Sequence, residues 1–267
     1  MVQLLTTLPA RDLNHLLDRL DALVGQGGAL LRSGSTGEFA VDGRRYEIPR
    51  YVFSGPLEGQ SPIRLGIFAG LHGDEPSGSE ALVIFLTELL RDPSRARGYE
   101  LHIYPVTNPT GHEDNTRYNR AGKDLNREFW RDSTEPEVRI LEAELLANRF
   151  YGIISLHADD TCTGLYGYAH DRLLNEALLR PALVASERIL PRDQRPMIDG
   201  FSASDGIINQ CFCGVLAAPP DQRPQPFDVI FETPALEPLD VQAQAAAVAL
   251  QAILDEYLGF IAQGQDL

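Results

Sequence analysis

Two side chains that commonly bind metal ions lie three positions apart in the segment 67–76, namely His72 and Glu75. Histidine nitrogen and glutamate oxygen bind Zn²⁺ at about 2.0–2.2 Å, and a catalytic zinc site has three protein ligands and an open position for water. Hydrolytic metal chemistry therefore needs one more ligand, for which His157 is the candidate. Without a third ligand, the pair is better explained as a surface loop in which Glu75 stabilises a helix start through the helix dipole.

Polar residues that could complete such a site follow directly after short apolar runs, which we expect to be β-strands. His72 follows residues 63–69, Asn108 follows 101–106, His157 follows 151–156, and Glu232 follows 229–231. Ligands bind outside the carboxyl ends of the strands in open α/β sheets. Each residue alone has a structural explanation, but their common placement after four separate strands favours a catalytic metal site at one edge of a sheet.

The alternation of strand-like and helix-like segments predicts an α/β fold. Helical stretches at 77–91 and 135–150 separate the expected strands, and Pro76 suits the first position of a helix. Amphipathic helices are also expected close to the N-terminus and at 241–261. Residues 191–226 are rich in Pro, Asp and Gly, which predicts long loops around a short strand.

The first sixty residues predict a helix followed by an antiparallel hairpin. The hairpin consists of the alternating segment 38–41, the turn Asp42-Gly43 and the run 45–54. We expect a single α/β domain over residues 1–267, with a mixed twisted sheet flanked by helices on both faces. Residues 1–60 would form an N-terminal helix and hairpin extension of this domain.

Composition restricts the partners and the location. The formal net charge of −15 argues against binding nucleic acid or anionic membranes, which attract Lys- and Arg-rich surfaces, and favours small molecules or peptides. The N-terminus lacks the basic and apolar regions of a signal peptide. Apolar runs such as 81–86 are far shorter than the ~20 residues that span a bilayer. We therefore expect a soluble, cytoplasmic protein.

The three cysteines are too few for a dense disulfide framework. Cys211-Phe212-Cys213 would place its two thiols on opposite faces of an extended chain. A metal site that combines Cys162 with His170 is disfavoured, because the Cys-x-Cys pair lacks the paired spacing of structural zinc sites. Free thiols in a reducing cytoplasm are the better interpretation.

An ordered set of polar motifs fills the central part of the chain. It contains Asn-Pro-x-Gly at 108–111, Thr-Arg-x-Asn at 116–119, Asp-Leu-Asn-Arg at 124–127, Ser-Leu-His at 155–157 and Glu-Thr at 232–233. Together with His72-x-x-Glu75, this set resembles the zinc carboxypeptidase family, whose wider membership includes murein peptide amidases and the succinylglutamate desuccinylase/aspartoacylase group. The resemblance runs from residue 63 to residue 234 and implies the zinc carboxypeptidase-like fold.

The resemblance assigns the metal and the base. His72, Glu75 and His157 would hold one zinc ion, and Glu232 would be the general base that takes a proton from metal-bound water. Zinc lowers the pKa of bound water towards ~7 and polarises the scissile carbonyl. A carboxylate within hydrogen-bond reach would therefore suffice to generate the nucleophile.

The resemblance also assigns substrate contacts. Arg117 would stabilise the oxyanion, where a fixed positive charge in a dry site is most effective. Asn126 and Arg127 would bind a substrate carboxylate, for which the planar fork of arginine is well suited. Asp124 would orient a metal-binding histidine from behind, although a turn residue is its ordinary explanation.

The chain departs from the digestive carboxypeptidases in one respect. Those enzymes carry a mobile tyrosine shortly before the catalytic glutamate, whereas no tyrosine lies between Tyr168 and Glu232. Tyr166 and Tyr168 could approach the site or could only pack, so the role stays unassigned. Three acidic residues could bind a substrate amine or could be solvated loop residues: Asp159, Asp160 and Asp205.

The leading functional hypothesis is a zinc metallopeptidase of carboxypeptidase type that hydrolyses an amide next to a free carboxylate in a small peptide. The spacing Thr-Arg-x-Asn-x-x-Gly-x-Asp-Leu-Asn-Arg resembles the murein amidase version, which makes murein peptides candidate substrates. The alternative is an N-acyl amino acid deacylase of succinylglutamate desuccinylase/aspartoacylase type. Such deacylases carry a β-rich domain after the catalytic glutamate, whereas residues 233–267 suffice for one helix, which favours the peptidase.

A catalytically inactive binding domain is the third hypothesis, and the intact set of candidate ligands, base and arginines speaks against it. Serine hydrolase chemistry is a poor competitor, since the chain has no Gly-x-Ser-x-Gly elbow.

Overall fold

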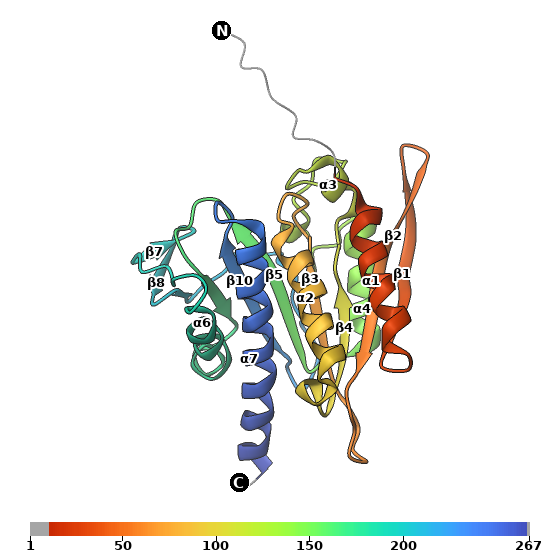
Figure 1. The fold of residues 1–267 in the computed structure, drawn as a ribbon. Helices are drawn as coiled ribbons and strands as arrows, with labels where there is room; N and C mark the ends of the chain where they lie inside the picture. The colour runs from red at the N-terminus through yellow and green to blue at the C-terminus, as the bar shows by residue number, and fades with distance from the viewer. Residues whose placement is uncertain (1–10, 266–267) are drawn as a thin grey trace.

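The structure, a computed structural model, describes residues 11–265 and contains one ten-stranded mixed sheet with helices on both faces (Figure 1). The strand order is β1-β2-β4-β3-β5-β10-β6-β9-β8-β7, and β3, β4, β5 and β10 form the parallel centre. The strands are β1 (Leu31–Val41), β2 (Arg44–Ser54), β3 (Ile63–Ala69), β4 (Tyr99–Tyr104), β5 (Gly152–Asp159), β6 (Tyr166–Ala169), β7 (Met197–Ile198), β8 (Phe201–Ser204), β9 (Ile207–Ile208) and β10 (Phe227–Pro234).

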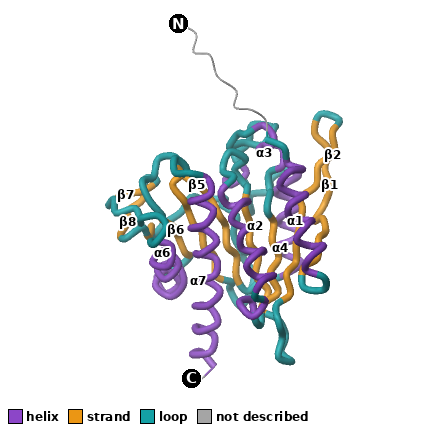
Figure 2. Tube along the Cα trace, in the orientation of Figure 1, coloured by secondary structure: helices purple, strands orange, loops and turns teal. Residues whose placement is uncertain are grey.

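Helices cover both faces of this sheet, which confirms the expected fold class (Figure 2). Helices α1, α2, α6 and α7 pack on one face, and α4 packs on the other. The helices are α1 (Leu13–Gly27), α2 (Ser77–Arg91), α3 (Pro109–Asp114), α4 (Pro136–Asn148), α5 (Arg172–Leu174), α6 (Arg180–Ser186) and α7 (Leu239–Gln265), with short irregular helical segments at Pro93–Ala96, Leu125–Arg127 and Asn175–Leu179.

Strand β3 and helix α2 position the first candidate metal ligands, and both have the bounds that the sequence predicts. The side chains of β3 alternate between the two cores, with Ile67 in the larger and Phe68 in the smaller. Helix α2 buries Phe85 and Leu86 against the sheet. Full burial of such a side chain stabilises the fold by about 1.5–3 kcal/mol. The turn that joins these two elements is therefore held firmly at both ends.

The predicted hairpin is present as β1 and β2. Asp42 and Gly43 both have positive φ, at 52° and 76°, as a two-residue type I′ turn requires. Strand β2 also pairs with β4, so the hairpin forms one end of the central sheet. Helix α1 begins at Leu13, with Asp12 as its N-cap, and the part of the expected helix at residues 1–10 lies outside the described residues.

The region 191–226 contains more structure than the single short strand expected. It forms β7, β8 and β9, and Asp199 and Gly200 make the turn between the first two with φ values of 50° and 80°. Strands of two to four residues are too short to show a clear alternation of apolar and polar side chains. Pairing with β6 therefore defines this part of the sheet more than its local sequence does.

Among the described helices, one has the length and the apolar composition that could cross a membrane, namely α7 over Leu239–Ala262, with a mean hydropathy of 1.4. Its alanine-rich face, including Ala245, Ala246 and Leu250, is buried against α2, α6 and the sheet. Core helices of globular proteins have the same length and composition, and α7 occupies such a position in this domain.

Candidate metal centre

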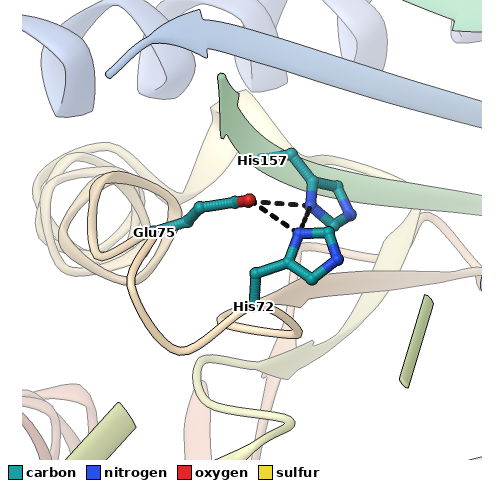
Figure 3. Close-up of side chains that lie close together, drawn as sticks. All are labelled: His72, Glu75 and His157. Atoms are coloured by element: carbon teal, nitrogen blue, oxygen red, sulfur yellow. Dashed lines mark hydrogen bonds and ion pairs between the residues drawn. The ribbon is translucent and has the colours of Figure 1, made fainter. Parts of the chain in front are cut away.

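Three side chains from two elements meet at the carboxyl ends of β3 and β5 (Figure 3). His72 and Glu75 lie in the turn between β3 and α2, and His157 lies in β5. One Glu75 oxygen is 2.6 Å from His72 Nδ1, and the other is 2.9 Å from His157 Nδ1. Their nearest ligand atoms all lie within 4.8 Å of one another, so the three residues form a candidate metal site.

Each of these side chains is oriented by a second contact. Asp124 Oδ1 accepts a hydrogen bond of 3.1 Å from His72 Nε2, and Ser155 Oγ lies 3.0 Å from His157 Nε2. The backbone N–H of Ala158 donates to a Glu75 oxygen at 3.0 Å. Because the Nε2 atoms of both imidazoles are engaged, both Nδ1 atoms remain to face the carboxylate.

The spacing of the donors fits a divalent metal. The two Nδ1 atoms are 3.2 Å apart. Two nitrogen ligands at about 2.0–2.1 Å from a tetrahedral zinc ion are separated by about 3.3 Å. All three residues are buried, at 3 to 8% exposure, which suits a site from which bulk water is excluded. The donor types and the spacing of the two imidazole nitrogens therefore fit zinc.

The charge states also suit metal binding. Burial alone would raise the pKa of Glu75, but the two imidazoles beside it hold that pKa well below its usual range. Burial lowers the pKa of His157 and keeps its imidazole neutral. Burial opposes the charged form of His72 too, but the carboxylates of Glu75 and Asp124 raise its pKa above the usual value. A bound cation would replace the hydrogen bonds and ion pairs that Glu75 now makes with the two imidazoles.

The Asn-Pro-x-Gly motif supports the turn that carries His72. Asn108 caps α3 by accepting a hydrogen bond from Gly111 N at 2.9 Å, and its amide donates to Leu71 O at 3.2 Å. Gly73 packs directly on Gly111, because a Cβ at Gly73 would lie 1.9 Å from the Gly111 carbonyl carbon. The motif therefore holds the turn between β3 and α2, which carries His72 and Glu75, in a fixed position.

Arg117 lies beside the metal site and is held by Asp124. Its Nε donates to Asp124 Oδ2 at 3.1 Å, and its Nη1 is 3.5 Å from Glu75 Oε1. Burial opposes the charge of Arg117, but Asp124 and Glu75 raise its pKa above the ordinary value. The side chain is 36% exposed, so the guanidinium remains accessible from the pocket.

A pocket of about 360 Å³ opens next to these residues. It brings together the residues that the resemblance assigns to substrate contact and proton transfer: Arg117, Asn126, Arg127 and Glu232 line it, with His72 and Glu75. Asp124 lies behind Arg117 and His72. Three of the four predicted strand ends, those of β3, β5 and β10, therefore border one cavity, whereas Asn108 after β4 is fully buried beneath the turn that carries His72.

Asn126 and Arg127 reach the pocket from the short helix at Leu125–Arg127. The Asn126 side-chain oxygen accepts a hydrogen bond from Leu216 N at 2.9 Å, which leaves its amide nitrogen as a donor for a substrate group. The Arg127 guanidinium stacks on Phe212, with Cζ 4.1 Å from the ring centroid. This stacking fixes the plane of the fork and leaves its edge to bind an anion.

Glu232 lies near the end of β10 and opposite His157 of β5. It is partly exposed to the pocket. Burial raises its pKa well above the usual value, and the neighbouring charges of Glu75 and Asp159 raise it further. A carboxyl group in this environment can hold a proton near neutral pH, and a divalent cation beside it would favour its ionised form.

Tyr166 and Tyr168 both line the pocket. Tyr166 is buried and donates a hydrogen bond of 3.1 Å to Asp159. Asp159 and Asp160 also line the pocket, whereas Asp205 pairs with Arg180 at 3.5 Å and does not.

Sequence reasoning missed several pocket residues that come from the region 191–226. These are Asp199, Phe201, Ile208, Phe212 and Val215. The dipeptide Asp199-Gly200 could have indicated a hairpin in this region, because Asp-Gly is typical of tight hairpin turns. Cys211 lines the pocket as a free thiol, and no cysteine belongs to the candidate metal group in the described part of the chain.

Asp124→Ala should weaken metal binding without removing a ligand. The substitution leaves His72 Nε2 and Arg117 Nε without their acceptor. Loss of such an orienting partner typically costs 10- to 100-fold in metal affinity, so we expect an increase of about that size in the zinc Kd. Competition with a chromophoric chelator would measure it, with Asp205→Ala as the control. Equal Kd values for the two variants would contradict the prediction.

Residues 62–159 match the sequence model of the succinylglutamate desuccinylase/aspartoacylase catalytic domain. The matched segment contains all three residues of the candidate metal site, together with Arg117 and Asp124. No curated protein sequence matches the chain.

Solved structures of similar fold cover nearly all of the chain. A protein from Shewanella denitrificans OS217, provisionally named a metallopeptidase, is 26% identical, with a TM-score of 0.75 over 91% of this chain and 89% of that one. A metallo-carboxypeptidase from Burkholderia cenocepacia has the same fold at 18% identity, with a TM-score of 0.73 over 94% of this chain and 70% of that one. Carboxypeptidase A from Helicoverpa armigera has a TM-score of 0.69 at 16% identity, over 93% and 73% of the two chains. In its fold, and in its sequence over residues 62–159, the chain thus resembles the zinc carboxypeptidases and their succinylglutamate desuccinylase/aspartoacylase relatives.

Proposed function

We propose that the protein is a zinc-dependent metallopeptidase of carboxypeptidase type, which hydrolyses an amide bond next to a free carboxylate in a small peptide. The observation that carries the proposal is the shared pocket, in which the candidate metal site lies beside the carboxyl group of Glu232 and two arginines. The similarity to the 26% identical Shewanella protein, which is named for the same type of activity, supports it.

In this proposal, His72, Glu75 and His157 hold the zinc ion. The ion would lower the pKa of a bound water and polarise the scissile carbonyl. Glu232 takes a proton from the attacking water and returns it to the leaving nitrogen, for which a raised pKa is suitable. Asp124 keeps the His72 ring in the orientation that directs Nδ1 to the metal.

The two arginines would each bind a different negatively charged group of the substrate. Arg117, whose Nη1 lies 3.5 Å from Glu75 Oε1, would stabilise the oxyanion that develops on the scissile carbonyl. Arg127 and the amide of Asn126 would bind the substrate carboxylate on the other side of the scissile bond, since charge-assisted hydrogen bonds to a planar fork are strong and directional. Phe212 maintains the orientation of that fork.

The second candidate is an N-acyl amino acid deacylase, because residues 62–159 match the deacylase catalytic domain. Both reactions cleave an amide beside a carboxylate, and both use the same metal and base. They differ in the group on the acyl side, which is a peptide in one case and a small acid such as succinate or acetate in the other. Murein peptides are a subclass of the first.

A substrate panel with the zinc-loaded protein tests the proposal. C-terminally free peptides, γ-D-glutamyl-diaminopimelate peptides and N-succinyl or N-acetyl amino acids should be compared by kcat/KM. We expect the peptides to be cleaved, and amidation of their C-terminal carboxylate to reduce cleavage by 100-fold or more, on the order of the ~3 kcal/mol of a charged hydrogen-bond pair. Cleavage restricted to N-acyl amino acids would favour the deacylase, and no cleavage of any class would favour an inactive binding domain.

We further propose that the enzyme works in the cytoplasm on soluble substrates. The three free cysteines suit a reducing compartment. The net charge of −15 disfavours nucleic acid and anionic membranes as partners.

A further inference from the structure

The strand that carries Glu232 presents two more residues to the same side. Successive side chains of a strand point to opposite faces, so Asp228, Ile230 and Glu232 share one face of β10. All three are partly exposed, whereas the residues between them are buried. Glu232 and Ile230 line the active-site pocket. Asp228 lies four residues before Glu232 in the strand, at a distance of about 13 Å.

A chain of cavities follows this face from Glu232 to Asp228. A small cavity of about 50 Å³ shares Ile230, Tyr168 and Val215 with the active-site pocket and is also lined by Asp228. A third cavity, of about 410 Å³, shares Asp228 with the second and opens near Trp130. The active-site pocket therefore has an extension that leads along β10 to Asp228.

The segment Val215–Ala218 lines this extension and is held by hydrogen bonds to two other parts of the chain. Leu216 N donates to Asn126, one of the proposed carboxylate-binding residues, at 2.9 Å. Trp130 Nε1 donates to Ala217 O at 3.0 Å. The extension is thus a built part of the pocket and is linked directly to the residues proposed to bind the substrate carboxylate.

Asp228 is the one acidic residue that lines the far part of this extension in the described chain. Its Oδ1 accepts a hydrogen bond from Ala218 N at 3.1 Å, while Oδ2 has no hydrogen-bond partner and no ion pair among residues 11–265. Burial raises its pKa to about 7. A bound cation would pair with the free oxygen of this largely buried carboxyl group and would favour its ionised form.

We propose that this extension is a specificity subsite, in which Asp228 binds the cationic end of a long substrate side chain such as that of lysine or arginine. The substrate residue is the one whose carboxylate contacts Asn126 and Arg127, so the inference rests on the proposed function. Ile230 and Val215 would contact the aliphatic stem, which a lysine side chain supplies as four carbons. Asp228 would then favour substrates with a positively charged side chain, although it lies far from the scissile bond.

Matched peptides test the subsite in the zinc-loaded full chain. The two substrates differ only in a C-terminal lysine or norleucine, which have similar length but differ in charge. We expect the wild type to prefer lysine in kcat/KM, and Asp228→Asn to reduce that preference about 10- to 100-fold, because a hydrogen-bonded charge pair is replaced by a neutral contact. Asparagine can still accept the hydrogen bond from Ala218 N, so the segment Val215–Ala218 should stay in place.

Asp221→Asn is the matched control, since it removes an equal charge from an exposed position outside these cavities and should keep the wild-type preference. A wild type that cleaves norleucine and lysine peptides equally well would overturn the subsite while leaving the peptidase proposal intact. An unchanged lysine preference in Asp228→Asn would overturn it too. Should that variant not fold, Ile230→Phe narrows the passage, and it should lower the ratio of lysine to alanine peptide cleavage.

Binding measurements separate the subsite from catalysis. Calorimetric titration of the zinc-loaded protein with free L-lysine and free L-norleucine needs no turnover. Tighter binding of lysine that disappears in Asp228→Asn would support the subsite even if no peptide were cleaved, in which case the peptidase proposal alone would fail. Equal binding of the two amino acids would count against the subsite whatever the enzyme hydrolyses.

Discussion

Glu232→Gln should reduce kcat on the best substrate of the panel by about 10²- to 10⁴-fold, the range that a positioned general base contributes. Glutamine has nearly the same shape as glutamate but cannot accept a proton from water near neutral pH. Glu232 is not one of the three residues in the candidate metal group, so the zinc content should stay close to one ion per chain. Steady-state kinetics together with elemental analysis of the same preparation measures both quantities.

Glu237→Gln provides the matched control for this experiment. It makes the same chemical change five residues further along the chain, at an exposed position that does not line the pocket. We expect it to have wild-type kcat and zinc content. Wild-type turnover in Glu232→Gln would show that another group takes the proton, and a loss of zinc from that variant would show that Glu232 holds the metal instead.

His157→Ala should abolish stoichiometric zinc binding and, with it, hydrolysis. The substitution removes one of three ligand atoms and leaves Glu75 with a single imidazole partner in a buried site. A ligand that binds only the folded state raises its stability by RT ln(1 + [L]/Kd), which is about 2.7 kcal/mol at a concentration of 100 Kd. The wild type should therefore melt several degrees higher with zinc than after chelation, and His157→Ala should show no such difference.

His15→Ala is the control for the metal experiment, because this histidine lies on the exposed side of α1 and outside the active-site pocket. It should retain one zinc ion per chain and the zinc-dependent rise in Tm. If His157→Ala retained both properties, the metal would have to bind elsewhere. A wild type that neither contains zinc nor melts higher in its presence would remove the basis of the proposed mechanism.

Part of the fold follows directly from local sequence. The run 63–69 is apolar and rich in branched residues, and the apolar residues of 77–91 have helical spacing, so both elements have the predicted bounds. Pro76 lies at the N-cap of this helix, one position before the first helical position that the sequence suggested. Strand β4 begins two residues before the expected position, because Tyr99 and Glu100 pair with β3. Pairing partners, which a single sequence does not reveal, decide where a strand starts.

The strands beyond β10 could not be found in this way. β7 and β9 have two residues each, and their positions depend on pairing with neighbours far along the chain. The same limit applies to the pocket wall that they and the segment Val215–Ala218 form. Conformational preferences of short segments are weak, so contacts with the rest of the domain override them.

The sequence by itself determined which chemical groups are present and at the end of which strand each one lies. Their types and order in the chain predicted a site built from His72, Glu75 and His157, because histidine and carboxylate are metal ligands whatever their surroundings. Only the tertiary structure decided that both Nδ1 atoms face one carboxylate, that Asp124 holds His72, and that the pocket extends to Asp228. His72 and His157 are 85 positions apart, and the distance between such residues is fixed by the packing of the whole sheet rather than by the residues next to them.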